Sequence, residues 1–265
     1  MKLGIFDSGL GGLLITKAVQ EKMPDLDIVY FGDTLRLPYG NRSDEAIYRF
    51  TKRAIDFLFA QDCSLIVIAC NTASATALRR LQQEYLPGAY PGRNVLGVIV
   101  PTLEVAIDKG FKNLGLIATN YTVHSDVFRE ELAKISPDIT FTQRATPLLV
   151  PLIENGGEQW VEDVLAHYLE PFKVAGVECL LLGCTHYSFL RKQIQSIMGD
   201  DVALLCQDEI VPVKLEGYLS HHPEYSDKIS RNGAAQFYVS EYTEHYSAAA
   251  QTIYGAPIKI EEVEL

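Results

Sequence analysis

The stretch Leu65-Ile66-Val67-Ile68-Ala69-Cys70-Asn71-Thr72 has a second version later in the chain, Cys179-Leu180-Leu181-Leu182-Gly183-Cys184-Thr185-His186. Each version is a short apolar run, typical of a buried strand in a parallel sheet, that ends in a small residue and a cysteine. A fainter echo relates Gly4-Ile5-Phe6-Asp7-Ser8 to Gly115-Leu116-Ile117-Ala118-Thr119. Open α/β sheets bind ligands at the carboxyl ends of their strands. We therefore expect two similar lobes that face each other, with one cysteine on each side of a cleft.

The rest of the chain predicts an α/β fold, because short apolar runs alternate with segments of helical period. Ser43, followed by Asp44 and Glu45, is the expected N-cap of one helix, and residues 158–175 and 187–198 are expected to form two more. Such alternation implies mainly parallel sheets with crossover helices. The expected strands lie at residues 3–6, 28–31, 65–69, 95–100, 114–118, 179–182 and 202–205.

Charge and composition exclude several classes of function. The chain has 265 residues, of which 48% are hydrophobic, and a formal net charge of −11. This charge argues against binding to nucleic acid, and it means that a small anionic substrate must be attracted by local groups. No apolar run is long enough for a signal peptide or a membrane span. The five cysteines lack the spacing of a zinc site, so we expect reduced thiols in a cytoplasmic protein.

Two of the cysteines are candidates for chemistry. Cys70 and Cys184 each follow a predicted strand and precede polar residues, whereas Cys63, Cys179 and Cys206 are expected in the core. A cysteine at a helix N-terminus lies at the positive end of the helix dipole, which can lower its pKa toward neutrality. The alternative is that both are small buried hydrophobes at strand ends.

Two glycine-containing turns are further candidates. Asp7-Ser8-Gly9-Leu10-Gly11-Gly12 follows the first strand, and the backbone N–H groups of such a loop can bind an anion at a helix start. Its spacing matches neither a dinucleotide fingerprint nor a P-loop. Pro38-Tyr39-Gly40 reads either as a simple turn or as part of a site.

Taken together and in this order, several segments resemble the glutamate racemases of the aspartate/glutamate racemase superfamily. Each is modest alone, and jointly they are highly specific. The segments are Phe6–Gly12, Asp33–Ser43, Ala69–Ser74, Val100-Pro101, Ala118–Val123, Pro147–Glu154 and Leu182–Tyr187.

This resemblance implies two pseudo-symmetric α/β lobes with the active site between them: residues 1–96 plus 207–265 form the first lobe, and residues 97–206 form the second. It implies an isomerase that interconverts L- and D-glutamate, without cofactor or metal, to supply D-glutamate for peptidoglycan synthesis and so for cell wall and cell shape. The expected partner is the small substrate glutamate, with no nucleic acid and no membrane, and a homodimer is compatible with the resemblance.

The resemblance also implies roles for individual residues. Cys70 and Cys184 would be the two acid/base residues. Asp7 would assist Cys70, and His186 with Glu154 would assist Cys184. The implied substrate-binding residues are Asp7, Ser8, Pro38, Tyr39, Gly40, Asn71, Thr72, Thr119, Thr122, Thr185 and His186.

The chain departs from the family pattern at three places. Ser188 replaces a common proline, Thr146 replaces a frequent cysteine, and Gln207-Asp208 stands where an Asp-Ser pair is usual. None of them removes an implied catalytic residue, so they bear on substrate contacts. The segment 209–265 matches only loosely, and we expect it to form helices that close the first lobe.

Inversion of an α-carbon suits two facing cysteines, because one base cannot easily reach both faces of the carbon. The nearest alternative activity is racemisation of aspartate or another small acid. Alternatives from other classes are a cysteine hydrolase built on Cys184 and His186, a dithiol redox protein, and a non-catalytic binding module on the same fold.

Overall fold

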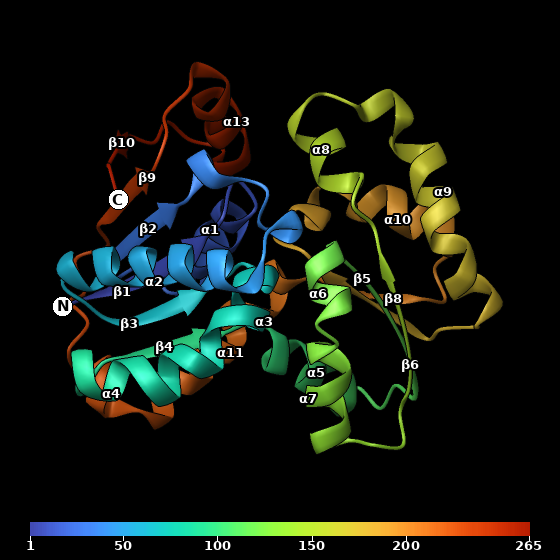
Figure 1. Ribbon diagram of the computed structural model, residues 1–265, viewed down its shortest axis with the longest axis horizontal. Helices are drawn as coiled ribbons and strands as arrows, with labels where there is room; N and C mark the ends of the chain where they lie inside the picture. Colours follow the sequence, from blue (N-terminus) through green and yellow to red (C-terminus); the bar gives the residue numbers. More distant parts are fainter.

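The computed structural model describes residues 1–265 apart from the side chain of Glu158. Two lobes lie side by side, and each is a parallel sheet flanked by helices (Figure 1). Both chain termini lie on the first lobe (Figure 1). Among the described helices, none combines the length and the hydropathy that a bilayer span requires. The two parallel sheets with flanking helices confirm the predicted α/β fold class.

The first sheet has six parallel strands in the order β10-β9-β2-β1-β3-β4. Its interior strands β1 and β3 are almost wholly buried because helices cover both faces of the sheet. The strands are β1 (Lys2–Asp7), β2 (Ile28–Gly32), β3 (Cys63–Ile68), β4 (Asn94–Gly97), β9 (Ala235–Val239) and β10 (Ile260–Glu262).

The second sheet has four parallel strands in the order β6-β5-β7-β8. Its central strands, β5 and β7, are likewise buried. The strands are β5 (Asn113–Ala118), β6 (Thr140–Ala145), β7 (Cys179–Gly183) and β8 (Ala203–Leu205).

The internal echo of the sequence corresponds to equivalent strands of the two lobes. β1 corresponds to β5, and β3 corresponds to β7. β1 pairs with β3 as β5 pairs with β7, so the corresponding strands are neighbours in both sheets. Asp7 ends β1 and Cys70 follows β3, while Thr119 follows β5 and Cys184 follows β7. The polar residues that the sequence places after strands therefore gather at one end of each sheet.

Helices cover both faces of each sheet with buried apolar side chains. In the first lobe α1, α11 and α13 pack on one face, and α2 and α3 pack on the other. In the second lobe α9 and α10 cover one face, and α5 and α7 cover the other. The helices are α1 (Gly12–Lys22), α2 (Asp44–Ala60), α3 (Asn71–Arg80), α4 (Leu86–Ala89), α5 (Ile99–Asp108), α6 (Asn120–His124), α7 (Val127–Ile135), α8 (Leu149–Glu154), α9 (Glu158–Val174), α10 (Arg191–Met198), α11 (Gln207–His221), α12 (Pro223–Ser226) and α13 (Glu244–Tyr254).

Two predicted boundaries were wrong. The apolar run 95–100 is not one strand, because β4 ends at Gly97 and α5 begins at Ile99. The run stays apolar because the start of α5 is buried in the core of the second lobe. The helix expected over 187–198 is a 3₁₀ segment, Thr185–Leu190, followed by α10.

The C-terminal segment is also not purely helical as expected. It contributes β9 and β10 to the first sheet, in addition to α11, α12 and α13. These strands are short and lie toward one edge of the sheet, so their sequences lack a continuous buried run. The edge strand β6 was not predicted for the same reason, since Phe141 is its only buried residue.

We propose that the lobes divide close to residue 96, where β4 ends, and between residues 206 and 207. The strands of the first sheet come from 2–97 and 235–262, and those of the second come from 113–205. α11 begins directly after β8, and its buried Val211, Leu215 and Leu219 pack into the core of the first lobe.

Asp27 fastens the C-terminal segment to the first lobe just before β2. Its carboxylate accepts hydrogen bonds from Ser230 Oγ at 2.6 Å, from the backbone N and side chain of Asn232 at 3.1 and 2.7 Å, and from Ala234 N at 3.0 Å. The hydrogen bond from Ser230, together with the others, holds the pKa of Asp27 well below its usual value. The chain is thereby fixed as it enters β9.

We expect Asp27→Ala to lower the free energy of unfolding by about 1–3 kcal/mol at neutral pH, because several donors lose a charged acceptor. Since the pKa is depressed in the folded state, this contribution is present above the unfolded pKa of about 3.9 and is lost as pH falls through the folded value. Urea unfolding at neutral and acid pH measures both effects.

Asp25→Ala is the matched control. Asp25 forms an ion pair with Arg231 on the same turn, but the two side chains are 49% and 52% exposed. Its loss should lower the free energy of unfolding much less than the loss of Asp27, because water screens an exposed ion pair. Equal effects of the two substitutions would contradict the role given to Asp27.

Candidate functional site

A small cavity of about 30 Å³ lies between the two lobes, and both Cys70 and Cys184 line it. The side chains come from the ends of strands in the two sheets and from the loop before α2. The lining residues are Ser8, Leu37, Pro38, Tyr39, Gly40, Cys70, Asn71, Thr72, Thr119, Val150, Gly183, Cys184, Thr185 and His186.

Cys70 is the N-cap of α3 and is 6% exposed. Its Sγ accepts a hydrogen bond from Ala73 N at 3.5 Å and lies 3.4 Å from Ser8 Oγ. Burial, with the nearby charge of Asp7, raises the pKa of Cys70 to about 12. The expected lowering of this pKa by the helix dipole was therefore wrong, because desolvation and a neighbouring carboxylate outweigh it.

Asp7 lies behind Cys70 and is fully buried. Its Oδ2 accepts hydrogen bonds from Gly9 N at 3.0 Å and Gly12 N at 3.1 Å, so the amides of the glycine-rich loop bind the protein's own carboxylate. A Cβ at Gly12 would lie 2.3 Å from Asp7 Cβ, which is why the loop needs glycine there. Burial raises the pKa of Asp7 despite these bonds and the charge of His186.

On the opposite side of the cavity, Cys184 Sγ lies 3.8 Å from His186 Nδ1. The other ring nitrogen, Nε2, lies 2.7 Å from Glu154 Oε1. Burial by itself would lower the pKa of His186, but the hydrogen bonds to Cys184 and Glu154 outweigh it and raise this pKa well above its usual value. In its protonated form the imidazole can donate toward both partners at once.

Several contacts cross between the lobes around the cavity. Thr72 Oγ1 of the first lobe lies 2.9 Å from Thr119 Oγ1 and 3.4 Å from Thr122 Oγ1 of the second. Thr185 Oγ1 donates to Asp7 Oδ1 at 3.3 Å. The lobes are thus in close contact beside the cavity.

The structure brings the sequence-predicted residues together. All of them line the cavity except Asp7, Thr122 and Glu154, each of which contacts a residue at the cavity. Tyr39 lines the cavity, but its hydroxyl donates its proton to Asp33 Oδ2 at 2.6 Å, so this proton is not available to a ligand.

Sequence reasoning missed some residues of the site. Leu37, Val150 and Gly183 line the cavity, and they stand inside segments that were already singled out. Gln207 was noticed only as a departure, yet its side-chain amide bonds to that of Asn71. No local pattern could reveal this pair, since the two residues are 136 positions apart.

The other two departures have partners as well. Thr146 Oγ1 lies 2.6 Å from the hydroxyl of Tyr187, and Ser188 Oγ donates to Asp208 Oδ1 at 2.6 Å. Both contacts involve the segment that follows Cys184. All three departures therefore make hydrogen bonds close to the cavity.

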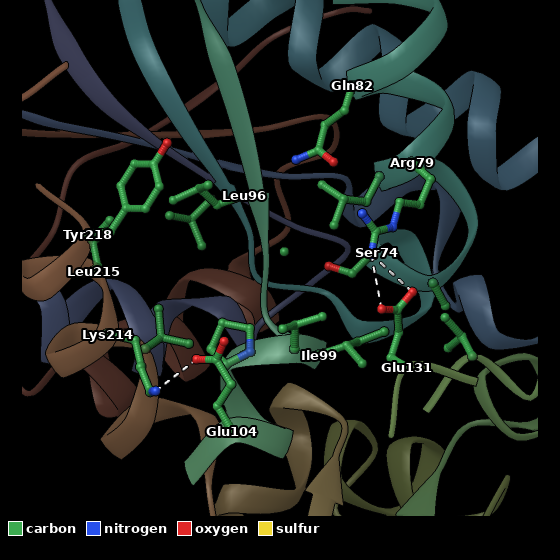
Figure 2. Close-up of a pocket in the computed structure, with 18 residues that line it drawn as sticks. Ser74, Arg79, Gln82, Leu96, Ile99, Glu104, Glu131, Lys214, Leu215 and Tyr218 are labelled. Carbon is green, nitrogen blue, oxygen red and sulfur yellow. Dashed lines mark hydrogen bonds and ion pairs between the residues drawn. The ribbon is translucent and has the colours of Figure 1, made fainter. Parts of the chain in front are cut away.

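A larger, mostly apolar pocket of about 380 Å³ lies between α3, β4, α5, α7 and α11 (Figure 2). Charged groups at its rim are paired with each other, Arg79 with Glu131 and Lys214 with Glu104 (Figure 2). Neither Cys70 nor Cys184 lines this pocket, so the smaller cavity is the candidate active site despite its size. Within the described residues, no cluster of His, Cys, Asp and Glu is placed to hold a metal ion.

Comparison with known proteins agrees with this geometry. The family model of Asp/Glu/Hydantoin racemase matches residues 14–206. The glutamate racemase of Aquifex aeolicus is 44% identical over 202 residues, which cover 75% of this chain and 76% of that protein. The glutamate racemase of Paracoccus denitrificans is 34% identical, over 98% of this chain and 99% of that protein. This chain belongs to the glutamate racemase family.

A solved glutamate racemase has the same fold. The enzyme of Francisella tularensis, crystallised with D-glutamate, superposes with a TM-score of 0.89 at 30% identity and covers 100% of this chain and 97% of that one. The resemblance inferred from the sequence is thus confirmed, and the chain is an amino-acid racemase, an isomerase. The cysteine hydrolase, the redox protein and the binding module lose their support.

For this glutamate racemase we expect Glu154→Gln to lower the pKa of His186 relative to the wild type, because the substitution removes the negative charge beside Nε2. NMR titration of the imidazole resonances measures it. His167 is the internal reference, because its ring contacts Arg144 and not Glu154. An unchanged pKa of His186 would show that Glu154 does not hold its proton.

Proposed function

We propose that this chain interconverts L- and D-glutamate by transferring the α-proton between two cysteines, and so supplies D-glutamate for peptidoglycan synthesis. Cys184 takes the proton from L-glutamate and Cys70 takes it from D-glutamate. The observation that carries the proposal is that one cysteine from each lobe lines the same cavity.

The chemistry requires two groups of opposite protonation state at the start of each turnover. One cysteine must be a thiolate that removes the proton, and the other must be a thiol that delivers one to the opposite face. The raised pKa of Cys70 keeps it a thiol. The protonated His186 donates toward Cys184, and a cationic imidazole stabilises negative charge on a neighbouring sulfur. This resting arrangement suits the L-to-D direction.

Binding of the substrate rests on local dipoles, since the whole chain is acidic. The glycine-rich loop offers little, because Asp7 already accepts two of its N–H groups. The carboxylates of glutamate are therefore assigned to the hydroxyl and amide groups of the cavity, among them Ser8, Thr72 and Thr185, and to the N-terminus of α3. In a closed cavity such contacts also stabilise the carbanion. The mechanism uses no cofactor.

The lobes must separate for glutamate to enter. A cavity of about 30 Å³ holds roughly two water molecules. The contacts of Thr72 with Thr119 and of Asp7 with Thr185 cross between the lobes, so they would part on opening. Their re-formation around the substrate would exclude water from the reaction.

Aspartate or another small acid remains the second candidate substrate. The segment Pro38-Tyr39-Gly40 favours glutamate by family resemblance, and polarimetry on both acids decides between them. The reduced cysteines are the basis for proposing a cytoplasmic enzyme, and a homodimer is compatible with the family resemblance.

In D₂O we expect the first-formed D-glutamate to carry deuterium at the α-carbon. Cys70 delivers a proton that has exchanged with solvent, whereas unreacted L-glutamate recovers its original hydrogen from Cys184 and stays largely unlabelled. Proton NMR of each enantiomer well before equilibrium measures this.

Substantial unlabelled product would refute the two-base mechanism, because a single base would carry the substrate's own hydrogen across. Cys70→Ala and Cys184→Ala should each reduce the rate at least ~10²-fold, since each removes a positioned acid/base group. If either variant racemised glutamate at a near wild-type rate, the two-base mechanism would also be refuted.

The neighbours of the two cysteines should affect the two directions differently. Asp7→Asn should slow proton abstraction from D-glutamate more than from L-glutamate, and His186→Asn should do the reverse. The equilibrium constant cannot change, so the difference must appear in single-turnover rates or isotope effects. Equal effects of both substitutions in both directions would argue against the assignment of Asp7 to Cys70 and His186 to Cys184.

A further inference from the structure

The first two residues of α11 contact both cysteine-bearing segments. Gln207 bonds to Asn71, which directly follows Cys70. Asp208 accepts a hydrogen bond from Ser188, which lies in the 3₁₀ segment after Cys184. The start of α11 is therefore tied to both sides of the cavity at once.

The contact of Gln207 with Asn71 is a reciprocal amide pair. Asn71 Nδ2 donates to Gln207 Oε1 at 2.7 Å, and Gln207 Nε2 donates to Asn71 Oδ1 at 2.6 Å. Both residues are 2% exposed. An amide has two N–H groups and two lone pairs on its oxygen, so Asn71 keeps one donor and one acceptor after pairing. Because Asn71 lines the cavity, these remaining groups are its means of contact with a substrate.

We propose that Gln207 is a positioning residue for racemisation: it holds the amide of Asn71 in one place so that its free N–H or oxygen meets a charged group of glutamate. This inference rests on the proposed function. Gln207 itself does not line the cavity, so it acts through Asn71. The hydrogen bond that Ser188 donates to Asp208 fixes the start of α11 against the segment that follows Cys184. It thereby also fixes the position of Gln207.

Gln207→Glu tests the pairing with almost no change in size. An ionised carboxylate accepts the hydrogen bond from Asn71 Nδ2, but its second oxygen faces Asn71 Oδ1 and repels it. A protonated carboxyl group donates to Asn71 Oδ1 and restores both bonds. The KM for glutamate of this variant should therefore be raised at alkaline pH and return toward the wild-type value as pH falls.

The pH range in which KM recovers depends on the surroundings of residue 207. Burial raises the pKa of a carboxyl group, and neighbouring acids raise it further. Titratable groups on the segments that meet there include Asp7, Cys70, Cys184, His186, Arg191, Cys206, Asp208 and Glu209. Because the cysteines also titrate, the ratio of the variant's KM to the wild-type KM at each pH is the quantity to compare.

Gln207→Leu removes both hydrogen bonds at every pH. We expect it to raise KM about tenfold, the consequence of leaving one buried amide unpaired, while kcat stays within about threefold. Gln195→Leu is the matched control, because Gln195 Nε2 donates to the backbone oxygens of Gly199 and Val202, away from the cavity. It should leave KM unchanged.

The outcomes distinguish a failure of the proposed function from a failure of the positioning role of Gln207. If the wild-type chain does not racemise glutamate, the proposed function fails. If it does, and both Gln207 variants keep the wild-type KM at all pH values, the positioning role is wrong. A fall in kcat with an unchanged KM, or a rise of KM in Gln207→Glu that does not diminish at lower pH, would also overturn it, since either points to general damage.

Discussion

The buried carboxylate of Asp7 is the interaction on which the site depends. It is fully buried, and it organises the loop that follows β1 by accepting the amides of Gly9 and Gly12. It also receives the hydroxyl of Thr185 from the other lobe, so the same group shapes one lobe and holds the second against it. Burial raises the pKa of Cys70, and the charge of Asp7 raises it further. A group that costs free energy to bury thus shapes the loop, joins the two lobes and raises the pKa of a neighbouring thiol.

The sequence predicted the parts of this arrangement that depend on short-range pattern. β3 and β7 are interior strands buried on both faces, so their apolar runs are continuous and end sharply at Cys70 and Cys184. Since parallel strands align their carboxyl ends, residues that follow neighbouring strands, such as Ser8 after β1 and Cys70 after β3, meet in space. The fold and the cavity lining follow from this rule and the family resemblance.

What could not be predicted depends on partners far away in the chain. β6, β9 and β10 lie toward sheet edges and are partly exposed, so they lack the pattern of a buried strand. The pKa of Cys70 is a second case, because the helix dipole is visible in the sequence, whereas the burial of the thiol and the position of Asp7 are not. The pairing of Asn71 with Gln207 is a third.

The unequal surroundings of the two thiols have an energetic consequence. Mirror-image substrates have equal free energies in water, but a folded chain of L-residues is not its own mirror image, even when its two lobes are similar. Cys70 is next to Ser8 and Asp7, and Cys184 is next to His186. The two bound enantiomers must therefore differ in free energy and in the barrier each one faces. A reaction with no thermodynamic preference in solution therefore acquires one inside the protein. The difference in free energy between the bound enantiomers is balanced by the difference in their free energies of binding and release.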